Sequence, residues 1–521
     1  MNTIKYDAVV IGAGNGGLVS ATRMAKYGMK VLLVEQHNVP GGFASSFVRG
    51  RFEFEPALHE LGAVGNKNNP GYIYQLFDEL GVNDLVTWHE VKEAFTIVLK
   101  ENNQVKEYSF PFGREAFARK LDEYDKGCYK EVLRFIDLCT EIYDAFLWLE
   151  FNKGKANQKE LKQKFPNFLS SGSYTLKQVL NTFKLSKFAK NILSAYWTYL
   201  GEPPEILDFT LYGVMFSEYI NYSAYIPGCR SHEISSALVT KFQEYGGEVW
   251  FNTKATKIVV ENYNIKKVIT TKGEIETNIV IANCSPNIVY GELIDKDKVP
   301  PRDNKLVNFR KLNKQGFSFY IGLNIRPEDL KLKDYSYFMY SGLNQDRNYE
   351  NIKSIEKNNE YIVVILNNVV KDASPDGTCI MSFTTLYEDA WNDVKDVDYF
   401  KTKEKIAYKM IKDFEEKMNV NIMDHIEEIE IATPITFARY TGVKNGVIYG
   451  YSDNKSDAII SRSKFMDNDI NVKNLFFAGG YSFRAHGYST TYKSGDIAGK
   501  KAYGKHMEAF VNAKSKKENT L

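Results

Sequence analysis

Cysteine is scarce in this sequence, and long apolar runs are missing. Its five cysteines form no C-x-x-C pair and are scattered along 521 residues, at Cys128, Cys139, Cys229, Cys284 and Cys379. An odd, scattered set supports neither a disulfide framework nor a structural zinc site, and it favours a reducing cytoplasm. No stretch approaches the roughly 18 apolar residues of a membrane-spanning helix. The first residues, Met1–Asp7, also lack the apolar core of a signal peptide, so we expect a cytoplasmic protein.

Charge of one sign does not dominate either, and several catalytic motifs are absent. The chain carries 67 Lys and Arg against 65 Asp and Glu, a net charge of +2, so we expect no nucleic-acid partner. H-E-x-x-H, G-x-S-x-G and the P-loop do not occur. Aromatic residues are abundant at 14%, which is typical of large apolar surfaces in a core or around a ligand.

The first fifty residues follow the pattern of a dinucleotide-binding unit. We predict a buried strand over Tyr6–Ile11, a glycine turn over Gly12–Gly17, a helix over Leu18–Tyr27 and a strand over Lys30–Val34 that ends at Glu35. This order within about 30 residues predicts dinucleotide binding. The alternative, a glycine turn that binds nothing, leaves the spacing of the acid and the glycines unexplained.

Each residue type in this pattern has a physical reason. Gly12 permits the tight turn, Gly14 lets backbone N–H groups approach a pyrophosphate, and Gly17 lets the helix pack close to the strand. The helix N-terminus offers positive potential to the phosphates. Glu35 would accept hydrogen bonds from a ribose diol.

Two later blocks extend the pattern. Gly41 and Gly42 let the chain pass close to a second part of a long cofactor, and they resemble the second fingerprint of the two-dinucleotide-binding-domain flavoproteins, which bind FAD. A strand over Ile279–Ala282 is predicted further on, and the resemblance implies that Ala255 offers backbone hydrogen bonds to the adenine.

The last block lies near the C-terminus. A strand over Asn474–Ala478 leads into a helix that we expect to start with Ser489 as N-cap and to continue to about Tyr503. The N-terminus of this helix would point at the flavin pyrimidine edge. The residues expected to hold the cofactor here are Gly479, Gly480, Gly487, Tyr488 and Ser489.

The ordered blocks together resemble the phytoene desaturase, carotenoid isomerase and retinol saturase group, within the amine oxidase-like flavoprotein superfamily. Thr433–Thr436 (T-P-x-T) followed by Gly446–Gly450 (G-x-x-Y-G) is similar to the segment that precedes the last block in that group. The resemblance implies an α/β fold, with a Rossmann-like FAD-binding domain and an inserted α+β substrate domain.

The expected division follows from the same blocks. The FAD-binding domain would be discontinuous, the first insertion helical, aromatic and basic, and the second insertion a substrate domain with an antiparallel sheet. The FAD-binding domain would comprise residues 1–66, 221–300 and 440–505. The first insertion would comprise residues 67–220 and the second residues 301–439, and residues 506–521 would form a charged tail.

Catalytic candidates are the titratable residues that the resemblance places near the flavin. Glu55 and His59 follow the glycine pair, in a setting that shifts pKa and supports proton transfer. Arg484, His486 and Tyr488 adjoin the last block, where the group usually has small residues and proline. Alternatively, Glu55 and His59 are structural, and Arg484 clamps the FAD diphosphate.

We therefore predict an FAD-dependent oxidoreductase or isomerase that acts on carbon–carbon double bonds of a long apolar lipid, by hydride exchange with flavin N5. Desaturation, saturation and isomerisation all stay open. No cysteine follows Cys379, so the FAD would be non-covalent, and no second G-x-G-x-x-G identifies an electron partner. An amine oxidase and a non-catalytic FAD-containing lipid-binding protein are the alternatives.

Residues 151–190 hold nine lysines and a single acid, Glu160, with aromatic residues between them. This composition is typical either of a peripheral membrane contact or of a solvated face.

Overall fold

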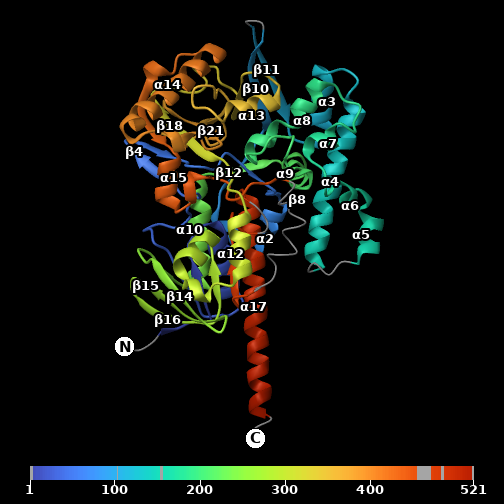
Figure 1. The fold of residues 1–521 in the computed structure, drawn as a ribbon. Coiled ribbons are helices and arrows are strands. Elements are labelled where there is room, and N and C mark those ends of the chain that lie inside the picture. Colours follow the sequence, from blue (N-terminus) through green and yellow to red (C-terminus); the bar gives the residue numbers. More distant parts are fainter. Residues whose placement is uncertain (1–3, 102–103, 153–156, 455–470, 483–485, 519–521) are drawn as a thin grey trace.

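The computed structural model describes residues 4–101, 104–152, 157–454, 471–482 and 486–518 (Figure 1). A five-stranded sheet, parallel at every strand pair, has strands from three distant stretches of the chain. Its order is β13 (Glu248–Trp250), β3 (Val31–Val34), β2 (Ala8–Ile11), β17 (Val280–Ala282) and β23 (Leu475–Phe477). The predicted Rossmann-like α/β fold is thus confirmed.

Side chains on the central strands alternate between two cores, as the period of two in a strand requires. Ala8 and Val10 belong to the core that contains α1 (Asn15–Lys26), whereas Val9 and Ile11 pack toward a second sheet. The strands of that sheet, in spatial order, are β1 (Ile4–Lys5), β16 (Gly273–Glu276), β15 (Asn264–Thr270) and β14 (Ala255–Glu261).

Helix α1 packs against both α10 (Arg230–Glu244) and α17 (Tyr488–Glu518). Arg23, on α1, is 3% exposed, and its guanidinium lies 2.6 Å from Asp496 of α17 and 2.6 Å from Glu79 of α2 (Tyr72–Leu80). One buried cation therefore ties three helices together.

Helix α17 differs from the prediction at both ends. Tyr488 is already its first residue, so Ser489 lies inside the first turn and does not cap it. The helix continues past Tyr503 to Glu518, which makes most of the expected charged tail helical. Lys, Ala and Glu, which are frequent here, are strong helix formers, and Figure 1 shows this end projecting from the body.

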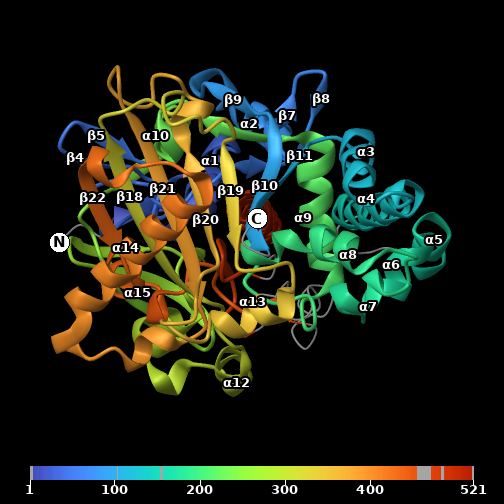
Figure 2. The same ribbon diagram turned by 90° about the horizontal axis from the view of Figure 1, so that it is seen from above.

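A seven-stranded sheet lies in the upper part of the molecule in Figure 1 and is seen from above in Figure 2. Its order is β11 (Gln104–Pro111), β10 (Glu93–Glu101), β19 (Ser336–Tyr340), β20 (Tyr361–Ile365), β21 (Cys379–Tyr387), β18 (Gln315–Leu323) and β22 (Ile426–Ala432). The strands from residues 301–439 pair antiparallel, as expected, whereas the pair β10–β19 is parallel, so the whole sheet is mixed. The reason is that β10 and β11, rich in β-branched and aromatic residues, come from the stretch expected to be helical.

The remaining elements flank this sheet. Helix α14 (Tyr399–Met418) covers one face. A group of helices stands beside the sheet (Figure 2): α3 (Arg114–Tyr124), α4 (Tyr129–Phe151), α5 (Gln158–Lys164), α6 (Pro166–Ser171), α7 (Leu176–Leu180), α8 (Lys187–Leu193) and α9 (Phe209–Tyr222). In the described part of the chain, no helix has both the length and the apolar character that crossing a membrane needs.

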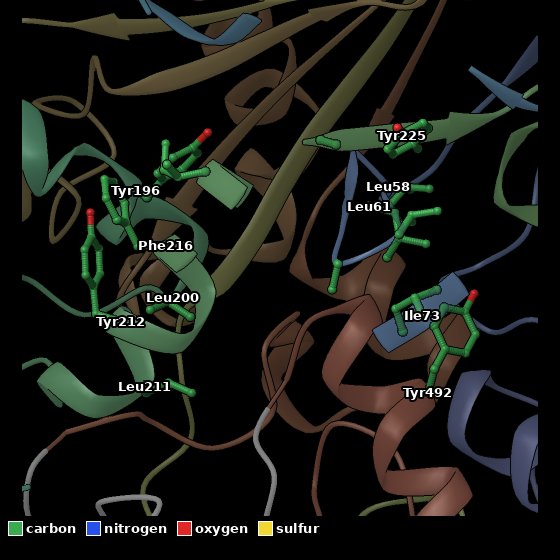
Figure 3. Close-up of a cluster of buried hydrophobic side chains, with 14 of the residues drawn as sticks. Leu58, Leu61, Ile73, Tyr196, Leu200, Leu211, Tyr212, Phe216, Tyr225 and Tyr492 are labelled. Carbon is green, nitrogen blue, oxygen red and sulfur yellow. The ribbon is translucent and has the colours of Figure 1, made fainter. Parts of the chain in front are cut away.

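A shared hydrophobic core joins these helices to the cofactor-side elements. Figure 3 shows two groups of its side chains, one with Tyr196, Tyr212 and Phe216, the other with Leu58, Leu61, Ile73 and Tyr492. Because both groups belong to one buried cluster, the sheet, the helices and α17 are packed as a unit.

We predict that R23M lowers the free energy of unfolding by about 2 kcal/mol, because it removes two charge-assisted hydrogen bonds and leaves the buried Asp496 with only Lys500 as a cation. The midpoint of urea unfolding measures this. R49M, which removes an ion pair with Glu430 whose partners are 46% and 37% exposed, should cost no more than about 1 kcal/mol. Equal losses in the two variants would contradict the importance of the buried ion pair.

Candidate active site

The turn between β2 and α1 brings backbone N–H groups to the carboxyl end of the parallel sheet. Gly12 has φ of +95°, which suits glycine. Gly14 precedes α1, and no side chain caps this helix, so the N–H groups of its first turn remain available to an anion. A Cβ on Gly17 would lie 2.0 Å from the Gly12 carbonyl oxygen, so only glycine permits this contact.

Asn283, directly after β17, lies where the first and last glycine blocks meet. A Cβ on Gly14 would lie 2.7 Å from its Nδ2, and a Cβ on Gly479 would lie 2.4 Å from its Oδ1. A Cβ on Gly16 would lie 2.4 Å from the Gly479 nitrogen. The Asn283 side chain therefore occupies the space that these glycines leave open, and the two blocks approach each other backbone to backbone.

Glu35 is held rigidly at the end of β3. Its Oε2 accepts from Ala13 N at 2.7 Å and its Oε1 from His37 N at 2.8 Å. Thr253 N donates to the Glu35 carbonyl at 2.8 Å, two residues before the buried Ala255. A carboxylate accepts about four hydrogen bonds, so Glu35 retains acceptor positions for ribose hydroxyls.

The second glycine pair runs alongside the first turn. Gly41 N donates to the Ala13 carbonyl at 2.7 Å, and a Cβ on Gly42 would lie 3.7 Å from Gly14 Cα. A Cβ on Gly41 would lie 1.9 Å from the Ala44 carbonyl oxygen, so this position also requires glycine.

The C-terminal block completes the same region. Gly479 N donates to Ser494 Oγ at 2.8 Å, and Gly487, with φ of +88°, directly precedes α17. The Tyr488 hydroxyl donates to the Phe43 carbonyl at 2.9 Å, which links the start of α17 to the loop after the second glycine pair. Ser489 Oγ donates to the buried Glu218 at 3.1 Å.

The residues present fit a dinucleotide cofactor. Asn15, in the uncapped first turn of α1, has a buried Oδ1 without a hydrogen-bond partner among the described residues. Buried acceptors normally have partners, and the hydroxyls of a cofactor would supply one. Together with the free N–H groups of α1 and the remaining acceptor positions of Glu35, this arrangement suits a pyrophosphate and a ribose.

A narrow cavity lies between the seven-stranded sheet and the helices. It measures about 20 Å³ and is lined mainly by aromatic and apolar side chains, with one buried acid, Glu360. Its walls include His59, Trp197, Tyr340, Ile362, Thr384 and Tyr449. His59 Nε2 is 3.2 Å from Thr384 Oγ1. His59 keeps some accessible surface because it faces the cavity, but the surrounding protein buries it and lowers its pKa to about 4, so its imidazole is neutral at pH 7.

Glu60, the next residue, is a buried acid that is 5% exposed. Tyr199 donates its hydroxyl to Oε1 at 2.7 Å, and Tyr219 donates to the Glu60 carbonyl at 3.3 Å. Oε2 is buried and has no hydrogen-bond partner in the described chain. Burial raises the pKa of Glu60 to about 8, so its carboxyl group is protonated at pH 7 and can donate a proton.

Glu55 has a different environment. Its oxygens accept from Leu58 N at 2.9 Å, from Ala57 N at 3.2 Å, and from Ser231 N and Oγ at 2.7 and 2.9 Å. Burial raises the pKa of Glu55 to about 7 although these donors favour the carboxylate. The arrangement anchors the turn before His59 to the start of α10.

Of the C-terminal candidates, Arg484 lies outside the described residues. His486 is buried, and its Nε2 forms a hydrogen bond with Asp453 Oδ2. The ring of Tyr449 lies 4.6 Å from the His486 ring and also lines the cavity with His59. The structure thus brings the two histidines into one neighbourhood through a shared tyrosine.

The sequence pattern did not single out Glu60, Tyr199 or Tyr219. Adjacency to His59 was the available signal for Glu60. The two tyrosines are 139 and 159 residues away from it, and no local pattern connects them.

The fold places the chain in a known class. Residues 10–80 match the family model of the NAD(P)-binding Rossmann-like domain. The solved structure of putrescine oxidase bound to putrescine superposes with a TM-score of 0.65 at 14% identity, and the match covers 96% of this chain and 99% of that one. The protein therefore has the fold of the amine oxidase-like dinucleotide-binding oxidoreductases.

Comparison with relatives of similar sequence gives a more specific group within this class. The chain is 27% identical over 509 residues to all-trans-retinol 13,14-reductase of Danio rerio, covering 91% of this chain and 82% of that protein. It is 26% identical over 471 residues to the chloroplastic prolycopene isomerase of Daucus carota, covering 86% and 72%. The predicted resemblance to the retinol saturase and carotenoid isomerase group is confirmed, and so is the predicted class of enzyme, an oxidoreductase or isomerase.

We predict that G17A reduces dinucleotide affinity at least about tenfold, because the added Cβ forces α1 away from the turn that must approach the pyrophosphate. Fluorescence titration of the stripped protein with the dinucleotide measures this. G504A is the matched control: its Cβ meets nothing within 4 Å in α17, and it should be neutral or slightly stabilising. Unchanged affinity in G17A would contradict the assigned phosphate site.

Proposed function

We propose that this protein is an FAD-dependent enzyme acting on carbon–carbon double bonds of a long, apolar, unsaturated lipid, an isoprenoid polyene or a fatty acid. The observation that carries the proposal is Glu60, a buried acid with an unpartnered Oε2 and a pKa raised to about 8, directly next to His59, which lines the aromatic cavity. The relatives support the choice of substrate, since their names refer to retinol and prolycopene.

We assign non-covalent FAD to the dinucleotide site, because the glycine pair at Gly41 and Gly42 extends the site beyond the first fingerprint. Bound FAD supplies a hydride donor or acceptor at its N5. The residues that would hold it are Gly12, Gly14, Gly17, Glu35, Gly41, Gly42, Ala255, Gly479, Gly480, Gly487, Tyr488 and Ser489.

In this proposal Glu60 handles the proton that accompanies the hydride. A carbon centre is a weak base, so its protonation needs a positioned acid that stays protonated near neutral pH. Tyr199 orients the Glu60 carboxyl group through its hydrogen bond, and neutral His59 offers the polar contact next to it. The aromatic walls exclude water from the reacting bond.

A lipid needs more space than the closed cavity offers. About 20 Å³ accommodates one or two water molecules. Binding therefore requires lining side chains such as Trp197 and Tyr449 to move, and these aromatic rings would then contact the chain of the substrate.

Amine oxidation is the second candidate reaction, favoured by the fold of putrescine oxidase. An ammonium group would need an ionised partner, and burial raises the pKa both of Glu60 and of the cavity-lining Glu360, which disfavours their carboxylate forms. A non-catalytic FAD-containing lipid-binding protein is the third possibility. Anaerobic titration with unsaturated lipids decides between them: loss of the flavin band near about 450 nm, or altered double bonds in the recovered lipid, establishes lipid chemistry. A flavin unchanged by lipid, with unaltered lipid, overturns the proposal.

We predict that E60Q lowers lipid turnover at least about 100-fold with unchanged FAD content, because the amide cannot donate the proton. Wild-type turnover should fall as the pH rises above about 8, where Glu60 ionises. Steady-state rates measured between pH 6 and 10, in steps of about one pH unit, test both effects.

The matched control is E53Q, on a carboxylate outside the cavity that accepts from Ser46 Oγ. It should keep both the rate and the pH profile of the wild type. The turnover rate of Y199F should lie between those of E60Q and E53Q. This substitution leaves the proton of Glu60 in place but removes the hydrogen bond that orients its carboxyl group. Wild-type rates in E60Q would exclude Glu60 as the acid.

We also propose a peripheral membrane contact at residues 151–190. Phe151, at the end of α4, is 87% exposed, and Leu169 on α6 is 45% exposed. Nine lysines against one acid surround them in the sequence. Exposed apolar side chains with lysines suit an anionic lipid surface, where each lysine contributes about 1 kcal/mol.

We predict that the holoenzyme floats with vesicles that contain anionic lipid and not with neutral vesicles. K159E/K162E should lose at least half of this binding, whereas K266E/K331E, which changes two exposed lysines elsewhere, should keep it. Binding that is equal in both double variants would overturn the proposed contact.

A further inference from the structure

Asp453 and His486 form a buried pair outside the group around Glu60. Asp453 has no exposed surface, and its carbonyl oxygen accepts from Asp208 N at 3.0 Å, which anchors it to the start of α9. His486 is 5% exposed, and its Nε2 contacts Asp453 Oδ2. A hydrogen bond at one ring nitrogen fixes the orientation of the imidazole and determines what the other nitrogen can do.

The other nitrogen, Nδ1, is buried and finds no hydrogen-bond partner among the described residues. Buried polar atoms in folded proteins normally have a partner. The aromatic ring of Tyr449 packs against the imidazole, with the ring centres 4.6 Å apart, and leaves Nδ1 unsatisfied. The position of His486 therefore points to a partner that is not part of this packing.

His486 also lies at the C-terminal edge of the dinucleotide site. It directly precedes Gly487 and the N-terminus of α17, and a Cβ on Gly480 would lie 3.8 Å from His486 Cβ. Gly479, the neighbour of Gly480, meets Asn283 at the junction of the glycine blocks. The unsatisfied nitrogen thus belongs to a residue that adjoins the cofactor-binding backbone.

We propose that Asp453 orients His486 so that Nδ1 donates a hydrogen bond to the pyrimidine part of the flavin ring and favours its reduced form. This inference rests on the proposed function, since it requires bound FAD. When both ring nitrogens carry hydrogen, Nε2–H is donated to Asp453 and Nδ1–H to the cofactor, and the carboxylate compensates the positive charge. Hydrogen bonds and charge near the flavin nitrogens tune its electronics. Asp453 is then a positioning residue.

Two substitutions separate the roles of the two nitrogens. H486Q keeps an amide near the position of Nε2, within reach of Asp453, and loses Nδ1. H486N keeps an amide near the position of Nδ1 and loses the contact with Asp453. D453N keeps the shape of the pair without its charge, and H425Q, on a histidine that contacts Asn324, is the control.

The measurement is the two-electron midpoint potential of the FAD in each holoenzyme, equilibrated with a reference dye, together with FAD affinity and thermal stability. We expect H486Q and D453N to weaken the preference for reduced over oxidised flavin about tenfold, which lowers the potential by about 30 mV. H486N should restore part of this shift, and H425Q should leave the potential unchanged.

An unchanged potential in H486Q and D453N, with FAD bound, overturns the inference. It is also overturned if both variants lose stability and bind both redox forms of FAD equally less tightly, because the pair is then only structural. A wild-type protein that binds no FAD would instead overturn the proposed function, so the two failures are distinguishable.

Discussion

The structure depends on the close approach of three backbone segments around the side chain of Asn283. Gly14, Gly16 and Gly479 lack the Cβ atoms that would collide with this side chain or with each other. The approach joins the first and last parts of the chain, which supply β2, α1, β23 and α17 to one folding unit. It also places the uncapped N-terminus of α1 and the start of α17 at the same edge of the parallel sheet, where a dinucleotide binds in such folds.

The chemistry that we propose depends on a second constraint, the burial of polar groups in an aromatic core. Tyr199 and Tyr219 surround Glu60 and remove it from water, and this burial keeps its proton in place. The same core holds His59 neutral and packs Tyr449 against His486. A proton donor for carbon and a tuned redox cofactor can therefore share one water-poor region, because one cluster of aromatic rings shields both.

Local patterns predicted the strand, helix and strand that surround the first glycine turn. The glycine turn, the strand after it and Glu35 lie within one βαβ unit, so residues at this sequence spacing are brought close together by local structure alone. Glu55 shows the limit of that reasoning, because the sequence does not reveal its contacts: two hydrogen bonds join it to Ala57 and Leu58 in the turn, and two join it to Ser231 at the start of α10. The mixed sheet shows another limit. Strand β10 pairs with β19, which is more than two hundred residues away, and no sequence pattern in either strand predicts this pairing.

The sequence by itself determined the fold class and the backbone of the dinucleotide site, because glycine spacing, strand length and the acid at the strand end are local demands on the chain. It also contained the order of blocks that relates the protein to the retinol saturase and carotenoid isomerase group. Tertiary structure decided which ionisable groups are buried and what they contact. It places Glu60 between two tyrosines that are distant in the sequence, and it brings His486 into a hydrogen bond with Asp453. Desolvation is a property of the surroundings and not of the residue, so the properties of the active site arise only when distant segments pack together.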